Sequence, residues 1–482
     1  MPGLARVKKY AAEFARCPVY KRLCEGVREP LDAFKILKRL SRHCYILESL
    51  ESAGERGRYT FLGYDPKSEI SCANGRFAVK NGAETVVQTD DPGARISRII
   101  RSNRSPRLKE LPPFTGGLVG YFAYDYVKYA EKSLKLCDKG AEFNDVDLML
   151  FDKVIAYDHK KGELILIVNI KTDNAEENYN NAVSELAYIE SVITSGAAAE
   201  PPALKLKSDF KALFNKDEYC AMALRAKEHI REGDIFQAVL SNAYSADAEG
   251  SLFGVYKTLR KINPSPYMFY FSSDKLEIAG ASPETLVRCK DGTVTTYPLA
   301  GTRPRGGTPR EDKELERSLL SDEKELAEHN MLVDLGRNDV GKISEFNSVR
   351  VSKYLTVERF SHVMHIASAV TGRLRGGLSA LDAIAAVLPA GTLSGAPKIR
   401  AVQIIDELEQ NRRGIYGGAI GYLSFSGDAD TCIAIRIAYK TGGRVFVRSG
   451  AGIVADSVPE SEYTECANKA AAVLKAIKDC AE

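Results

Sequence analysis

The chain has 482 residues, of which 44% are hydrophobic and 27% charged, and its formal net charge at pH 7 is +3. This is the composition of a globular protein with an extensive core, and so small a net charge disfavours a nucleic-acid or membrane partner. No run approaches the ~18 apolar residues that a membrane-spanning helix needs. The ten cysteines form no Cys-x-x-Cys pair, which disfavours a zinc site and fits a reduced, cytoplasmic compartment.

The first 195 residues mix strand and helix patterns. Runs rich in β-branched and aromatic residues predict strands over 44–50, 59–63, 117–124, 153–157 and 163–169. A helical pattern covers 178–193, and the polar, proline-bearing segment 91–113 is expected to be an exposed loop. The stretch 196–202 (GAAAEPP) predicts a boundary between an N-terminal region, 1–195, and a second region, 209–482.

The second region carries longer helical patterns and closely spaced strands. Helices are predicted over 217–232, 326–336, 380–388, 397–409 and 459–478. Strands are predicted over 235–244, 267–271, 276–279, 285–289, 417–425, 430–439 and 444–449, the last of them spaced as in an antiparallel meander. Because strands group with strands and helices with helices, we expect an α+β fold rather than a doubly wound parallel sheet.

Two pairs of glutamates lie on predicted helices in the second region. Glu325 and Glu328 are three residues apart, as are Glu462 and Glu465, so each pair occupies one helix face. Four carboxylates brought together could bind Mg²⁺, which prefers oxygen ligands. Each pair alone is more typical of a solvated helix face.

Arg436 interrupts the apolar strand predicted over 430–439. An arginine facing the core would need a partner, and its planar guanidinium suits a carboxylate. The alternative is an outward strand face shared with Cys432, Ala434 and Ala438. Gly450, Ala451 and Gly452 follow the strand predicted to end at 449, where small residues could admit an anion to the backbone or form a simple turn.

Other polar residues have both a structural and a functional interpretation from the residues alone. Thr392 precedes a predicted helix as a cap or faces a ligand. Gly301 and Thr302 begin a glycine- and arginine-bearing loop. His365 is either a structural histidine or a catalytic group. Glu284 is either a helix or turn cap or a catalytic group.

Long motifs in the second region resemble the chorismate-utilising enzymes, and within them the large subunits of anthranilate synthase. They include GASPETLVR (280–288), YPLAGTRPRG (297–306), LPAGTLSGAPKIRA (388–401) and RSGAGIVADSVPESEYTECANKA (448–470). The resemblance implies stacked antiparallel sheets wrapped by helices in one body. It also implies a lyase of tryptophan biosynthesis that converts chorismate and ammonia to anthranilate and pyruvate.

The resemblance also implies roles for individual residues. Glu328 and Glu465 would bind Mg²⁺, with Glu325 and Glu462 alongside. Glu284 would be the general acid for the C4 hydroxyl of chorismate, and His365 would act in the pyruvate-eliminating step beside Thr392. The implied substrate-binding residues are Gly301, Thr302, Tyr416, Arg436, Gly450, Ala451, Gly452 and Lys469.

Two positions separate members of this family. Relatives that add water carry a base lysine in the segment that reads DIFQAVLS (234–241) here, at the place of Gln237. An amide cannot serve as that base, which favours ammonia as the nucleophile. Aminodeoxychorismate synthases, the alternative enzyme, carry a lysine where this chain has Ala300. A catalytically silent binding subunit of the same fold is a second alternative.

The resemblance implies a partner and an inhibitor as well. The chain lacks the cysteine-between-glycines motif of a glutaminase, so we expect a separate glutamine amidotransferase subunit to supply ammonia. Tryptophan is expected to inhibit by binding Leu47, Glu48 and Ser49 together with Pro266, Tyr267 and Met268.

Overall fold

The computed structural model describes residues 3–50, 56–139, 143–360 and 363–481. In these residues the strands form two antiparallel sheets, one of 13 and one of 12 strands. The first sheet runs β1 (Arg16–Leu23), β10 (Glu163–Lys171), β9 (Lys153–Asp158), β3 (Tyr59–Tyr64), β2 (Cys44–Glu48), β14 (Tyr267–Ser272), β15 (Leu276–Ser282), β24 (Ile437–Thr441), β25 (Arg444–Ile453), β13 (Gln237–Glu249) and β11 (Lys205–Leu206), with β12 (Lys211–Ala212) and β21 (Gly395–Ala396) also pairing with β13.

The second sheet, like the first, contains strands from both the N-terminal and the C-terminal region of the chain. Its order is β18 (Leu299–Pro304), β20 (Val363–Arg373), β17 (Thr293–Thr296), β16 (Thr285–Lys290), β23 (Ala429–Ile433), β22 (Ala419–Ser424), β7 (Gly117–Phe122), β8 (Val146–Phe151), β4 (Ser68–Ala73), β5 (Arg76–Asn81) and β6 (Ala83–Gln88), with β19 (Arg350–Arg359) pairing with β20. The regions 1–195 and 209–482 thus contribute strands to both sheets.

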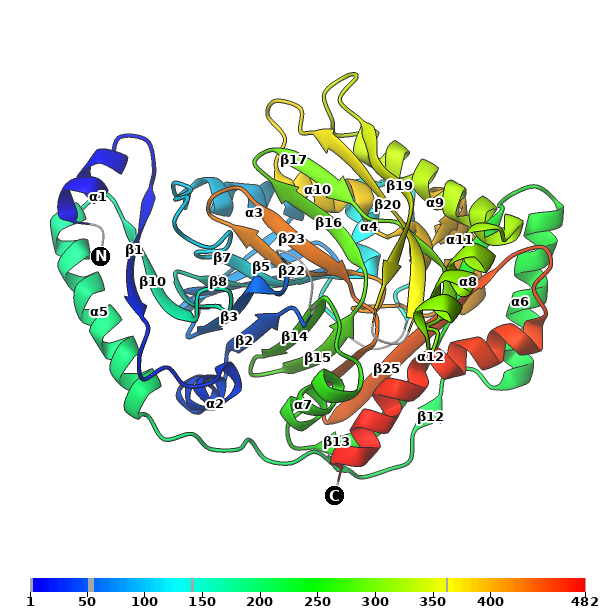
Figure 1. Cartoon of the computed structure of the whole chain (residues 1–482), viewed down its shortest axis with the longest axis horizontal. Helices are drawn as coiled ribbons and strands as arrows, with labels where there is room; N and C mark the ends of the chain where they lie inside the picture. The colour runs from blue at the N-terminus through cyan, green and yellow to red at the C-terminus, as the bar shows by residue number, and fades with distance from the viewer. Residues whose placement is uncertain (1–2, 51–55, 140–142, 361–362, 482) are drawn as a thin grey trace.

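Helices cover the outer faces of the sheets (Figure 1). Against the first sheet pack α1 (Leu4–Tyr10), α2 (Pro30–Leu40), α5 (Ala175–Ser195), α7 (Phe253–Ile262) and α12 (Pro459–Cys480). Against the second pack α3 (Pro92–Arg101), α9 (Glu323–Gly341) and α10 (Ala380–Val387). The remaining helices are α4 (Val127–Ala130), α6 (Lys216–Arg231), α8 (Pro309–Leu320) and α11 (Lys398–Glu409). The α+β fold with stacked antiparallel sheets is confirmed.

A third core lies between the two sheets. On β2, Cys44 and Ile46 pack toward the helices, whereas Tyr45 and Leu47 pack between the sheets. Because both faces of this strand are buried, its sequence is continuously apolar rather than alternating. None of the described helices combines the length and the hydropathy that crossing a bilayer requires.

The chain passes from one sheet to the other at several short connections, and two of these crossovers carry residues of the predicted site. Residues 283–284, the first crossover, connect β15 to β16, and residues 434–436, the second crossover, connect β23 to β24. The single strand predicted over 430–439 is therefore wrong. Its apolar pattern continues through the break because both halves are buried, and Arg436 turns the chain with φ +52°, a conformation uncommon outside glycine.

Two further expectations are corrected. The segment 91–113 contains α3, which the Asp91 side chain caps by accepting a bond of 2.8 Å from the Ala94 amide. Asp followed by Pro is a helix-start signal as well as a loop signal. The strand predicted over 444–449 continues to Ile453, so Gly450 to Gly452 lie within β25.

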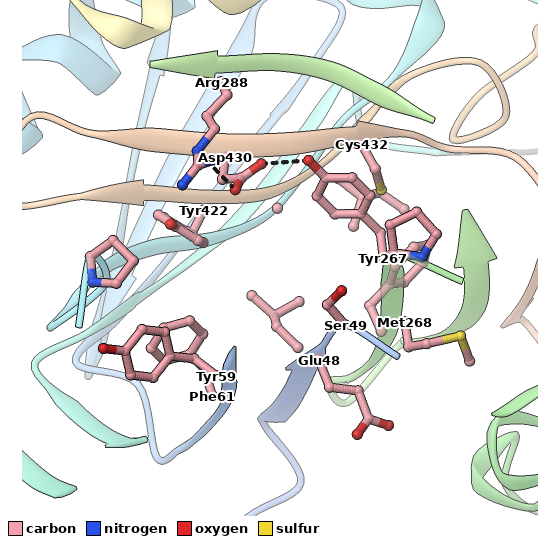
Figure 2. Close-up of a pocket in the computed structure, with 16 residues that line it drawn as sticks. Glu48, Ser49, Tyr59, Phe61, Tyr267, Met268, Arg288, Tyr422, Asp430 and Cys432 are labelled. Atoms are coloured by element: carbon pink, nitrogen blue, oxygen red, sulfur yellow. Dashed lines mark hydrogen bonds and ion pairs between the residues drawn. The ribbon is translucent and has the colours of Figure 1, made fainter. Parts of the chain in front are cut away.

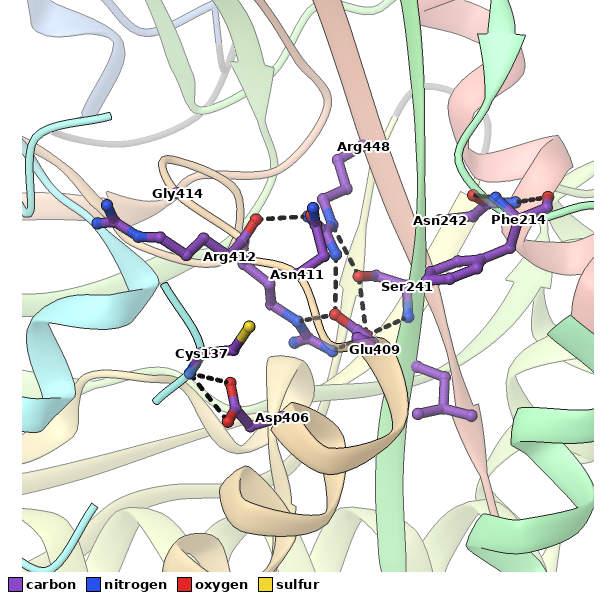
Figure 3. Close-up of polar contacts among 12 residues, drawn as sticks. Cys137, Phe214, Ser241, Asn242, Asp406, Glu409, Asn411, Arg412, Gly414 and Arg448 are labelled. Carbon is purple, nitrogen blue, oxygen red and sulfur yellow. Dashed lines mark hydrogen bonds and ion pairs between the residues drawn. The ribbon is translucent and has the colours of Figure 1, made fainter. Parts of the chain in front are cut away.

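A buried ion cluster joins the end of α11 to β13 and β25 (Figure 3). Glu409, Arg413 and Arg448 are each at most 3% exposed. The Glu409 carboxylate accepts bonds from Arg413 at 2.6 Å, Arg448 at 2.8 Å and the Ser241 amide at 2.7 Å. Burial alone would raise the pKa of Glu409, but the two guanidinium groups hold this pKa below its ordinary value.

Removing the Glu409 carboxylate will leave two buried arginines without their shared partner. We expect Glu409→Ala to lower the free energy of unfolding by about 3–5 kcal/mol, as breaking buried ion pairs does. The matched control is Glu407→Ala, an exposed position on the same helix, which should change it by less than about 0.5 kcal/mol. Urea unfolding of both variants measures the difference, and equal effects would contradict this assignment.

Candidate active site

The two crossovers bring Glu284 and Arg436 together. The Ile433 amide donates to the Glu284 carbonyl at 3.0 Å, and the Ala281 amide donates to the Arg436 carbonyl at 3.2 Å. Arg436 also influences the pKa of the Glu284 carboxyl electrostatically. Two residues 152 positions apart in the sequence thus share one site because the strands that carry them change sheets at the same place.

Glu284 has the environment of a general acid. Its side chain is half-buried, and Oε1 accepts a hydrogen bond of 3.1 Å from Thr392 Oγ1. Burial raises the pKa of this carboxyl to about 7, although Thr392, Arg436 and Lys469 each lower it. A carboxyl that keeps its proton near neutral pH can give that proton to a leaving group.

His365 on β20 faces Gly301 and Thr302 on β18. Its Nδ1 lies 2.9 Å from the Gly301 carbonyl oxygen and 3.1 Å from Thr302 Oγ1. Because a carbonyl only accepts, Nδ1 carries the proton and Nε2 keeps its lone pair. Burial lowers the pKa of His365, so the ring is neutral at pH 7 and can accept a proton. Gly301 has φ +63°, and a Cβ there would lie 3.2 Å from Glu325 Oε2.

Besides the groups around Glu284 and His365, the strands β13 and β25 form a wall of the site. A Cβ on Gly450 would lie 2.9 Å from the Tyr416 hydroxyl oxygen, and one on Gly452 would lie 2.8 Å from Gln237 Nε2. Ala451 lies between them and packs on the opposite side, in the core against α6 and α11. Gln237 is 4% exposed, and its Oε1 has no hydrogen-bond partner among the described residues. This glycine wall, formed by Gly450 and Gly452, therefore lies next to a hydrogen-bond acceptor that has no partner in the described part of the chain.

The predicted metal ligands lie on α9 and α12. Burial and the charges of Glu325 and Glu465 raise the pKa of Glu328, so carboxylates of both helices act on one region. Glu465 lies 2.6 Å from Lys469 Nζ, and Glu325 lies 3.5 Å from Arg303. The donor chemistry fits a hard divalent cation. Among the described residues, however, three potential ligand atoms lie within 4.8 Å of one another only at His229, Glu232 and Asp234, where Arg400 already pairs with Asp234.

A separate cavity lies between the two sheets (Figure 2), with about 700 Å³ of empty space when its open mouth is included. Its lining includes all six residues expected to bind tryptophan, which are Leu47, Glu48, Ser49, Pro266, Tyr267 and Met268. In Figure 2 the Glu48 carboxylate points away from the cavity, where it accepts a bond of 2.7 Å from Arg260. The buried Ser49 Oγ has no hydrogen-bond partner among the described residues.

The second sheet contributes lining residues that the sequence analysis missed. Arg288, Tyr422, Asp430 and Cys432 line the cavity opposite β2 and β14. Arg288 and Asp430 are charged residues inside strands, which was a usable signal. Their pairing across β16 and β23, at 3.7 Å, depends on a register that the sequence does not specify.

The whole chain is similar to known proteins. The model of the chorismate binding enzyme family matches residues 42–475. Anthranilate synthase component 1 of Acetivibrio thermocellus is 43% identical, with 100% of this chain and 99% of that protein covered. The same component of Aquifex aeolicus is 42% identical, with 99% and 97% covered. The chain belongs to the chorismate binding enzyme family.

Solved structures agree with this assignment. Anthranilate synthase component I of Streptococcus pneumoniae has a TM-score of 0.76 and 39% identity, covering 88% of this chain and 93% of that one. The menaquinone-specific isochorismate synthase of Escherichia coli has a TM-score of 0.71 at 18% identity, covering 98% of each chain. At that identity the second match shows the shared fold alone.

The raised pKa of Glu284 predicts a pH-dependent gain in stability from Glu284→Gln. The folded chain keeps the Glu284 proton up to about pH 7, whereas a free glutamate loses it near 4.5. The contribution of Glu284 to wild-type stability therefore falls as the pH rises from 4.5 to 7, and the neutral glutamine avoids this loss. We expect the variant to match the wild type at pH 4.5 and to be more stable by roughly 1–2 kcal/mol at pH 8. Thermal unfolding at the two pH values tests this, and a pH-independent difference would contradict it.

Proposed function

We propose that this chain converts chorismate and ammonia to anthranilate and pyruvate, as the large subunit of an anthranilate synthase in tryptophan biosynthesis. The similarity to anthranilate synthase components along almost the whole chain supports this reaction. The observation that carries the choice of nucleophile is Gln237, whose side-chain amide lies at the glycine wall and whose Oε1 has no partner among the residues described. An amide oxygen accepts a hydrogen bond from ammonia but cannot remove a proton from water.

In the first step, ammonia bonds to C2 of chorismate while the C4–oxygen bond breaks. Glu284 gives its proton to the departing hydroxyl, which leaves as water. The new ammonium group then loses one proton, which returns Glu284 to its acid form, so the step yields 2-amino-4-deoxyisochorismate and water. Thr392, bonded to Glu284 Oε1, orients the acid.

In the second step, the ring becomes aromatic as pyruvate leaves. His365 Nε2 removes the proton from C2, and the C3–oxygen bond breaks. The enolpyruvyl group takes up a proton to become pyruvate, and the ring product is anthranilate. The bond from His365 Nδ1 to the Gly301 carbonyl fixes the tautomer that this step needs.

Binding requires groups for the two carboxylates of chorismate. Arg436 offers a guanidinium for the enolpyruvyl carboxylate, with Gly301, Thr302, Tyr416, Lys469 and the backbone of Gly450 to Gly452 around the ring. Glu328 and Glu465 would hold Mg²⁺, with Glu325 and Glu462 alongside. When bound, the ion supplies positive charge for the ring carboxylate. Lys469 would then release Glu465.

We also propose a glutamine amidotransferase subunit as the source of ammonia and tryptophan as an inhibitor that binds the intersheet cavity. The word "component" in the names of the relatives supports a partner. The gathering of all six expected residues around one cavity supports the inhibitor site. The alternative reaction of an aminodeoxychorismate synthase is disfavoured by Ala300, which has no amine.

The reaction can be tested with the purified chain, chorismate, Mg²⁺ and an ammonium salt at mildly alkaline pH. We expect anthranilate fluorescence and pyruvate to appear together, and both to disappear when EDTA is added. An aminated product without pyruvate would contradict the second step. Unconsumed chorismate, even after a glutaminase subunit and glutamine are added, would contradict the reaction as a whole.

Ser49→Ala tests the proposed inhibitor site. Because it removes an acceptor and donor that has no other described partner in the cavity, we expect half-inhibition to need about tenfold more tryptophan. Inhibition is expressed relative to the uninhibited rate of each variant. Ser272→Ala on β14 is the matched control, since that hydroxyl bonds to the Arg42 carbonyl outside the cavity. Equal sensitivity of both variants would exclude Ser49 from the site.

A further inference from the structure

Tyr267 links the intersheet cavity to the strands that carry the catalytic groups. It belongs to β14 of the first sheet and lines the cavity. Its hydroxyl donates to Asp430 Oδ1 at 2.7 Å and lies 2.9 Å from Thr285 Oγ1, and both of these residues belong to the second sheet. Figure 2 shows the Tyr267 side chain reaching across the cavity wall to Asp430.

The direction of these hydrogen bonds follows from the number of protons. A phenol has one proton, which Tyr267 gives to the Asp430 carboxylate. The Tyr267 oxygen therefore accepts from the Thr285 hydroxyl. One side chain of the first sheet thus makes two hydrogen bonds to the second sheet. One goes to β16, which follows the first crossover, and the other goes to β23, which precedes the second crossover.

Thr285 lies directly beside the proposed acid. It follows Glu284 in the chain and pairs with Cys432 across β16 and β23. The register of these strands shifts between Thr285 and Val287, so the regular ladder is interrupted at this point. A movement of Thr285 is transmitted to Glu284 through a single peptide unit.

We propose that Thr285 is a positioning residue that couples occupancy of the intersheet cavity to Glu284 through its hydrogen bond with Tyr267. The inference rests on the proposed function. A ligand that binds between the sheets contacts Tyr267. It therefore stabilises whichever position of the Tyr267 hydroxyl gives the tighter complex. A change in the Tyr267–Thr285 bond displaces Glu284 from Thr392 and Arg436. Inhibitor and substrate thereby lower each other's affinity although they bind at different sites, because such coupling is reciprocal.

The test measures this coupling by binding alone. The dissociation constant of tryptophan is determined by calorimetry with Mg²⁺, with and without chorismate, and with no ammonium present. The coupling is the ratio of the two constants. In Thr285→Val we expect this ratio to fall by about fivefold, while the constant without chorismate changes by less than about threefold. Tyr267→Phe should reduce the ratio similarly, because it removes only the hydroxyl.

Two matched variants separate coupling from general damage. Thr285→Ser keeps the hydroxyl and should restore the wild-type ratio. Thr431→Val removes a buried hydroxyl that bonds to the Val287 carbonyl at 3.0 Å, between the same two strands but on the strand face opposite Asp430 and Cys432, and should leave the ratio unchanged.

Three outcomes would overturn the inference. They are a wild-type ratio of one, an unchanged ratio in Thr285→Val and Tyr267→Phe, and an equal loss in Thr431→Val. A wild-type chain that shows coupling but makes no anthranilate would count against the proposed reaction and leave the coupling supported, because the ratio is read from binding.

Discussion

The architecture of the site depends on the buried carboxylate of Glu409, which two arginines share. Arg413 also donates to the carbonyls of Leu393 and Val239, and Arg448 belongs to β25, which carries the glycine wall. The Glu409 carboxylate thus holds three parts of the site in place through Arg413 and Arg448. These parts are the loop with Thr392, the strand with Gln237 and the strand with Gly452. Because one carboxylate faces two guanidinium groups, the cluster keeps an excess of positive charge behind a site proposed for a dianion. Such an arrangement withstands burial only when all partners remain in place.

The two crossovers relate the proposed chemistry to the proposed inhibition. Glu284 and Arg436 lie where the chain passes between the sheets. The distance between these two residues therefore depends on how the two sheets are positioned relative to one another. The intersheet cavity is lined by both sheets, and its lining includes Asp430 and Cys432 on β23, the strand that precedes the second crossover. Packed cores respond to a ligand by changing between discrete arrangements rather than by deforming continuously. The proposed coupling uses this property, since a small molecule between the sheets would change the distance between the proposed catalytic groups.

Local patterns predicted the α+β class and most helices of the second region, because their apolar periodicity and caps are local signals. The motifs named the residues around Glu284 and His365, but their meeting depends on strand register and sheet changes between distant segments. Arg436 illustrates the limit, since a continuous apolar run hid the break that gives this residue its place. The ion pair of Glu409 was equally hidden, because nothing in a helical pattern marks a glutamate as buried. The four glutamates were predicted as a group, whereas the pairing of Glu325 with Arg303 depends on the tertiary arrangement.

A crystal structure of the chain grown with Mg²⁺, anthranilate and pyruvate would test the central claim most directly. We predict density for the ligands between Glu284, Arg436 and the glycine wall, and a cation held by Glu328 and Glu465 with Lys469 displaced from Glu465. Ligands bound elsewhere, or a cation held by other residues, would contradict the account of the site.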